Sequence, residues 1–147
     1  MRQTPAHDHA NLDLLAVMPA AARVAGAGCS RGALARAYKQ RVQDCHYTGI
    51  EIDADYAEQA SFFCDNILVG DIEAIIQGST LDELAGASCW GDTLEHLRAP
   101  WQVLRSLHRL LSDDGRACAC IPNMQHWSIQ LQLNSGLIRY VIRARRA

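Results

Sequence analysis

Arg23-Val-Ala-Gly-Ala-Gly-Cys-Ser-Arg-Gly-Ala-Leu-Ala-Arg36 is followed, a short distance along the chain, by Tyr47-Thr-Gly-Ile-Glu-Ile-Asp53. This pattern predicts a strand, a glycine-rich turn, a helix, and a second strand that ends in acidic residues. Small residues in such a turn let backbone N–H groups approach a ligand, and an acid at the second strand end accepts hydrogen bonds from ribose hydroxyls. The stretch therefore predicts an α/β fold with a pocket for a nucleotide-like ligand, and it fits more than one ligand class.

The composition of the chain narrows the class of protein. The 147 residues suit a single domain, 1–147, and 14 basic against 16 acidic side chains give no sign of a nucleic-acid partner. No apolar run approaches the roughly 18 residues that a membrane helix needs, and the N-terminus lacks the apolar segment of a signal peptide. Six cysteines without a C-x-x-C pair favour thiols in a reducing compartment. We therefore expect a cytoplasmic protein without a membrane partner, with a flexible leader at 1–10 and an irregular basic tail at 134–147.

Strand and helix patterns alternate along the chain. Strands are predicted at 23–27, 47–52, 66–69, 88–92 and 116–121, and helices begin after Asn11, Gly32 and Asp53 and at Pro100. The fourth strand is short and polar for its place. The alternation predicts a Rossmann-like, doubly wound, mostly parallel sheet flanked by helices. Ligands of such sheets bind at the carboxyl ends of the strands, so the residues at those ends are the candidates for function.

The first two strand ends supply two glycines and an acid. A side chain at Gly28 would push a ligand away from the backbone, and Gly32 lets the following helix start close to the strand. The Glu51 carboxylate can accept from both ribose hydroxyls. Its alternative is an exposed acid that caps the next helix, a role that Asp53 fits better.

The third strand end carries Asp71 and Ile72. The carboxylate can accept from an exocyclic amine such as that of adenine, with the isoleucine packed on the ring. An N-cap for the short following helix is the alternative for the aspartate, and it does not exclude the first role.

Asp92-Thr-Leu-Glu-His96 is the most polar cluster of the chain. In a helix its two acids and its histidine would share one face. They could then hold a divalent ion, or His96 could act as a general base. A plain helix start, with acids near its positive end, stays open. We assign no metal and keep Glu95 and His96 as the candidate catalytic residues.

Taken together, these segments resemble the class I S-adenosylmethionine-dependent methyltransferases. The matching segments are Val24–Gly32, Gly49–Asp53, Leu68–Asp71, Gly91–Leu97, and Leu111–Arg116 leading to Ile121-Pro-Asn123. Their order and spacing are similar to that family from about Asn11 to Trp127. The acid-x-x-Glu-His-Leu element and the Asp-Gly-Arg turn before the fifth strand are its most discriminating parts.

The resemblance implies S-adenosyl-L-methionine as cofactor and a small-molecule or sugar acceptor. The cofactor positions that it implies are Gly28, Cys29, Gly32, Glu51, Ile52, Asp71, Ile72 and Asp92. The glycine loop would border the methionine part and the ribose, Glu51 would hold the ribose hydroxyls, Asp71 and Ile72 would contact adenine, and Asp92 would line the cofactor floor. A sulfonium donor is already activated, so alignment of an in-line attack supplies most of the rate.

The sequence departs from this family in four places. The family usually has an acid, facing the ammonium group of the donor, where Gly26 stands. Ser30 replaces a usual glycine and Arg31 adds bulk beside the loop. The fourth strand is shortened, and we expect the last strands to be missing. These departures predict weak or absent methyl transfer.

Two other classes stay open. Gly26-x-Gly28-x-x-x-Gly32 matches a glycine pattern of nicotinamide-dinucleotide-binding oxidoreductases, although no Tyr-Lys pair stands at a useful spacing. A non-catalytic Rossmann-like binding module is the other alternative.

Overall fold

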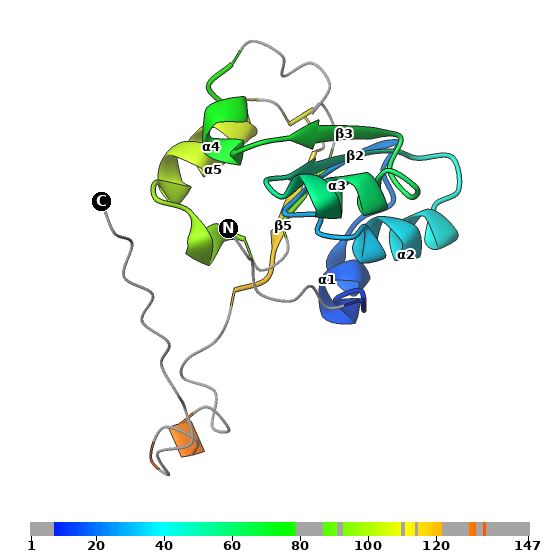
Figure 1. Cartoon of the computed structure of the whole chain (residues 1–147), viewed down its shortest axis with the longest axis horizontal. Helices are drawn as coiled ribbons and strands as arrows, with labels where there is room; N and C mark the ends of the chain where they lie inside the picture. Colours follow the sequence, from blue (N-terminus) through cyan, green and yellow to red (C-terminus); the bar gives the residue numbers. More distant parts are fainter. Residues whose placement is uncertain are drawn as a thin grey trace.

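Five parallel strands in the order β3-β2-β1-β4-β5 form the centre of the computed structural model (Figure 1). They are β1 (Arg23–Ala27), β2 (His46–Glu51), β3 (Asn66–Val69), β4 (Ala87–Trp90) and β5 (Ala117–Ala119). The structure describes residues 8–78, 93–109, 111–113, 115–121, 130–131 and 134, and the backbone of 87–90. The strand order reverses beside β1, which places the switch point of the sheet at the end of that strand. The predicted fold class is confirmed.

Several of the helices begin at a side-chain cap or at a proline. They are α1 (Leu12–Val17), α2 (Ala33–Arg41), α3 (Ala54–Ala60), α4 (Ile72–Ile75), the 3-10 turn η2 (Leu94–His96) and α5 (Pro100–His108). The side chains of Asn11, Asp53 and Asp71 accept backbone N–H groups at the starts of α1, α3 and α4. Pro100 occupies the first turn of α5, where its missing N–H costs nothing.

The helices cover both faces of the sheet. On one face Val24 and Tyr47 pack with residues of α1 and α2, among them Leu14 and Tyr38. On the other face residues of β1 and β2 pack with α4, η2 and α5; this cluster comprises Ala25, Ala27, Ile50, Ile72, Ile76, Leu94, Val103 and Leu107. Successive residues of β1 thus point to opposite layers. The sheet is therefore doubly wound, as predicted.

Several element boundaries differ from the prediction. The second strand is shifted by one residue to His46–Glu51, and the fifth is only Ala117–Ala119. The fourth strand starts one residue earlier than predicted and ends sooner, as Ala87–Trp90, and β1 and β5 pair with it on either side. The helix considered over Asp92–His96 is instead a 3-10 turn at Leu94–His96, which ends because Leu97 is extended.

Other predictions lie wholly or partly outside the described residues. These are the position of Asp92, most of the leader and most of the basic tail. Within the described part of the chain, no helix has the length and apolar character of a membrane span.

Candidate functional site

Glu51 joins the end of β2 to the loop that follows β1. The residue is 4% exposed. One oxygen accepts from the Ser30 N–H at 2.8 Å, and the other accepts from the N–H groups of Ile52 at 2.9 Å and Asp53 at 3.0 Å. The Cys29 N–H adds a bond of 3.1 Å to the Ile50 carbonyl. Since a carboxylate offers about four acceptor sites, Glu51 holds the glycine loop and keeps capacity for one more donor. Its contact with ribose stays a prediction.

The glycine loop turns through three left-handed residues. Gly28, Ser30 and Gly32 have φ values of 62°, 49° and 81°. Such a backbone is strained for Ser30, which is the position where the family usually has glycine. A Cβ on Gly28 would lie 2.5 Å from Oγ1 of Thr93, whose hydroxyl donates to the Ala27 carbonyl at 3.1 Å. The space beside Gly28 is thus taken by Thr93, a residue that the sequence analysis missed.

Gly32 makes a close approach to the end of α3. A Cβ there would lie 3.0 Å from Phe63 Cδ2 and 3.1 Å from Ala60 Cα. The sequence did not predict this neighbour. The glycine lets α2 begin against α3, and its contact with a cofactor stays a prediction.

Tyr47 explains the absent acid at Gly26. A Cβ on Gly26 would meet the tyrosine ring, 2.8 Å from Cε1 and 2.9 Å from Cζ, and would clash with the hydroxyl. The ring is 1% exposed and lies 6.1 Å from the ring of Tyr38, measured between centroids. The β1 position that carries an acid in the family is therefore filled from β2 by a phenol, and only glycine fits beneath it.

Asp71 lies at the end of β3, next to the end of β2. The Gly70 N–H donates to the Glu51 carbonyl at 2.8 Å, which brings the two acidic strand ends together. Asp71 Oδ1 accepts from the Glu73 N–H at 2.9 Å, so the predicted N-cap is confirmed. Its Oδ2 forms an ion pair of 2.6 Å with Arg98. The contact with adenine stays a prediction.

The two isoleucines at these strand ends differ in exposure. Ile72 is 7% exposed and belongs to the core between the sheet, α4 and α5. Ile52 is 57% exposed and follows Glu51 directly. Ile52 is therefore accessible to a ligand at this edge, whereas Ile72 is not.

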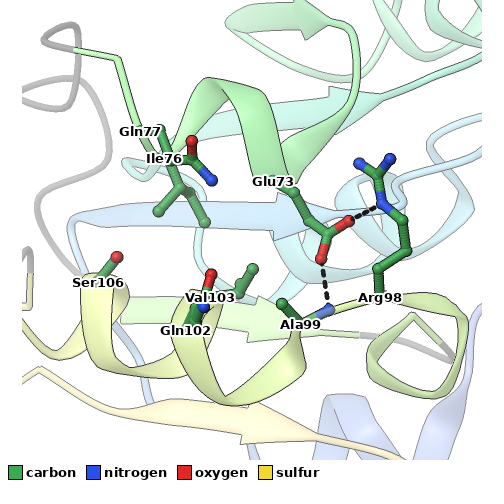
Figure 2. Close-up of a pocket in the computed structure, with 8 residues that line it drawn as sticks. All are labelled: Glu73, Ile76, Gln77, Arg98, Ala99, Gln102, Val103 and Ser106. Atoms are coloured by element: carbon green, nitrogen blue, oxygen red, sulfur yellow. Dashed lines mark hydrogen bonds and ion pairs between the residues drawn. The ribbon is translucent and has the colours of Figure 1, made fainter.

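Glu73 and Arg98 connect α4 with the start of α5 (Figure 2). Arg98 Nε donates to Glu73 Oε2 at 2.6 Å, and the Ala99 N–H donates to Oε1 at 2.7 Å. The bond from Arg98, and to a lesser extent that from the Ala99 N–H, holds the pKa of the Glu73 carboxyl below its usual range. Both residues border a hollow of about 430 Å³ between the two helices. This pair could not be predicted from the sequence, because its members are 25 residues apart and belong to no motif.

Glu95 and His96 are exposed on η2. In the part of the chain that the structure describes, neither side chain has a hydrogen-bond or ion-pair partner. The same part contains no group of three or more side chains placed to hold a metal ion. The catalytic roles of Glu95 and His96 stay predictions.

Two thiols meet beneath the glycine loop. A Cβ on Gly49 would lie 2.8 Å from the sulfur of Cys29 and 3.1 Å from that of Cys64. The hydrogen bond between the two thiols raises the pKa of Cys29, with burial adding to the effect, and lowers the pKa of Cys64. The Cys29 sulfur also donates to the Ser30 carbonyl at 3.9 Å.

Several solved structures have a similar fold. The plantazolicin methyltransferase BpumL in complex with SAH is 17% identical with a TM-score of 0.65, and the match covers 80% of this chain and 43% of that one. The mitomycin 7-O-methyltransferase MmcR is 18% identical with a TM-score of 0.58, and the match covers 76% of this chain and 35% of that one. Coclaurine N-methyltransferase bound to N-methylheliamine and SAH is 18% identical with a TM-score of 0.53, and the match covers 70% of this chain and 31% of that one. This chain thus spans less than half the length of these structures.

A search of curated proteins finds no match. A family model described as a methyltransferase domain matches residues 25–119, which is more than half of the chain and runs from β1 to β5. The chain therefore belongs to the methyltransferase domain family, with the fold of the class I S-adenosylmethionine-dependent methyltransferases.

Proposed function

We propose that the chain binds S-adenosyl-L-methionine across the ends of β1, β2 and β3 and transfers its methyl group to a small-molecule acceptor. The observation that carries the proposal is the adjacency of Glu51 and Asp71, two carboxylates on neighbouring strand ends beside a left-handed glycine loop. Family membership supports it. So does the presence of SAH in the structures of the plantazolicin and coclaurine methyltransferases.

The adenosine half of the cofactor fits the residues present. Glu51 keeps an acceptor site for a ribose hydroxyl, Asp71 lies next to it for the base, and the exposed Ile52 offers an apolar contact to the ring. The bound cofactor would supply an activated methyl group on sulfur. The task of these residues is to hold the adenosine so that the methyl group faces the acceptor.

The methionine half has fewer partners. Gly26 offers no carboxylate to the ammonium group, and Tyr47 occupies the adjacent space. A lost charge-assisted hydrogen bond costs roughly 1.5–3 kcal/mol of affinity. We therefore propose that binding rests on the adenosine half and that methyl transfer is weak. His96 is the proposed base for an acceptor proton, with Glu95 beside it on η2.

Calorimetry with SAH and, separately, with NADH tests the proposal. We expect SAH to bind and NADH not to bind. Glu51→Ala should abolish SAH binding, whereas Asp55→Ala, at an exposed acid in the first turn of α3, should leave the affinity unchanged. Because Glu51 also holds the loop, each variant is first checked for an intact thermal unfolding transition.

The alternative outcomes separate the classes. Binding of NADH alone would favour the nicotinamide class, and binding of neither ligand would favour a non-catalytic module. Unchanged SAH affinity in a folded Glu51→Ala variant would show that the ribose lies elsewhere.

A further inference from the structure

The segment between β4 and α5 is fastened at two points to the ends of other strands. Near its start, the Thr93 hydroxyl donates to the Ala27 carbonyl at the end of β1. Near its end, Arg98 reaches past the end of β3. Its Nη2 donates to Asp71 Oδ2 at 2.6 Å, and its Nε donates to Glu73 Oε2 at 2.6 Å. This segment therefore spans the edge of the sheet at which the cofactor is proposed to bind.

We propose that Arg98 is a positioning residue that fixes the Asp71 carboxylate for recognition of the exocyclic amine of adenine. The inference rests on the proposed function and adds to it the residue that gives selectivity for the base. Asp71 is held from two directions, because Oδ1 accepts from the Glu73 N–H and Oδ2 accepts from Arg98. Each oxygen still has a free acceptor site.

The guanidinium group of Arg98 is itself held in place. Glu73 is 8% exposed, and its second oxygen accepts the Ala99 N–H at 2.7 Å, so this carboxylate cannot rotate freely. Glu73 therefore fixes Nε of Arg98, and because the guanidinium is planar, its Nη2 then points at Asp71. A lysine carries one flexible point charge and cannot reproduce this geometry.

Fixing the carboxylate has a consequence for selectivity. The side chain of Asp71 is 37% exposed, so without Arg98 only the bond from the Glu73 N–H would hold it, and the rest of its freedom would be lost when the ligand binds. A carboxylate that is ionised and held in place accepts hydrogen bonds only, so it favours a purine with an amino group at position 6 over one with an oxo group there. Arg98 thus enforces a preference for adenine over hypoxanthine without touching the base.

The test compares the affinities of SAH and S-inosylhomocysteine, in which an oxo group replaces the adenine amine. By calorimetry we expect the unmodified chain to bind SAH about tenfold more tightly or better, as for the loss of one hydrogen bond to a charged group. Arg98→Ala should lower the ratio of the two affinities severalfold, because Asp71 is then held only at Oδ1. Arg105→Ala, at an exposed arginine of α5, should leave the ratio unchanged.

The affinity ratio separates positioning from a general loss of structure, which would weaken both ligands alike. If Arg98→Ala fails to fold, Arg98→Lys keeps the charge, and its ratio should still fall severalfold. A ratio equal to that of the unmodified chain in either folded variant would overturn the inference and leave the proposed function standing. Equal binding of both ligands by the unmodified chain would do the same. Binding of neither ligand would overturn the proposed function and the inference with it.

Discussion

Gly26 lies against the ring of Tyr47, which leaves no room for a side chain at position 26. Gly26→Ala would place a Cβ 2.8 Å from Cε1 of the buried tyrosine ring, so the ring or the strand must shift. We expect the free energy of unfolding to fall by about 1–3 kcal/mol, as is typical of overpacked cores. Urea denaturation followed by circular dichroism measures this loss.

A double variant provides the control for this pair. Tyr47→Leu removes the ring and leaves a cavity of its own, but it also removes the atoms with which the new Cβ collides. The two substitutions together should therefore cost less than the sum of their separate effects. Strictly additive losses would mean that the collision is relieved elsewhere.

Cys64 should behave as an unusually acidic thiol. Its pKa is lowered by the hydrogen bond from Cys29, so its reactive thiolate forms at a lower pH than in an ordinary cysteine. Cys29→Ala removes the donor and should move the midpoint of Cys64 alkylation to higher pH. Iodoacetamide labelling as a function of pH, read by mass spectrometry of peptides, measures the midpoint.

Cys45 serves as the internal reference for this experiment. Burial raises its pKa, and it lies outside the Cys29–Cys64 contact, so its slow labelling should not respond to Cys29→Ala. A Cys64 midpoint that stays the same in the variant would argue against the hydrogen bond between the thiols.

At the scale of elements, Glu73 makes the junction of α4 and α5 sensitive to acid. Its pKa is lowered in the folded state by Arg98 and the Ala99 N–H, whereas in the unfolded chain a glutamate has a pKa of about 4.3. The unfolded chain therefore takes up the proton first. The stabilisation is complete above the unfolded pKa and is lost as the pH falls through the folded pKa.

Glu73→Gln should consequently flatten the pH dependence of stability below about pH 5. Urea midpoints measured between pH 7 and pH 3 follow this change. Glu58→Gln, at an exposed position of α3, is the matched control and should keep the slope of the unmodified chain. An equal slope in the Glu73 variant would exclude this ion pair as a source of acid sensitivity.

The sequence predicted the elements of this molecule better than the partners of its site. Caps and strand ends depend on neighbours in the chain, so Asp53, Pro100 and the end of β1 could be placed from local pattern. Glu51 was correctly placed at a strand end, but its bond to the Ser30 N–H joins positions 21 apart. Such contacts arise only when the sheet assembles.

The interpretations that changed depend on contacts between elements. Thr93 reaches across 66 positions to the end of β1 and fills the space beside Gly28. Arg98 lies 27 positions from Asp71. Thr93 stands at an unspecified position of the acid-x-x-Glu-His-Leu element and Arg98 directly follows that element, so the pattern contains no information about their partners. The strand order likewise followed only from the structure.

At the scale of the whole molecule, β1 couples the proposed site to both helical layers. Val24 packs on the side of α1 and α2, whereas Ala25 and Ala27 pack on the side of α4 and α5. The glycine loop continues directly from this strand and is held to β2 through Glu51. A ligand that holds the loop should therefore stabilise the two layers together, in one unfolding transition.

Thermal unfolding with increasing SAH measures this coupling. A ligand at about 100 times its dissociation constant adds roughly 2.7 kcal/mol to the free energy of unfolding. For a chain of this size that corresponds to a rise in Tm of about 5–10 °C. NADH at the same concentration should give no rise, and Glu51→Ala should remove the response to SAH. Because β1 belongs to both clusters, the transition should move as one. A transition that splits, with one half independent of SAH, would mean that the loop stabilises only the layer nearest to it.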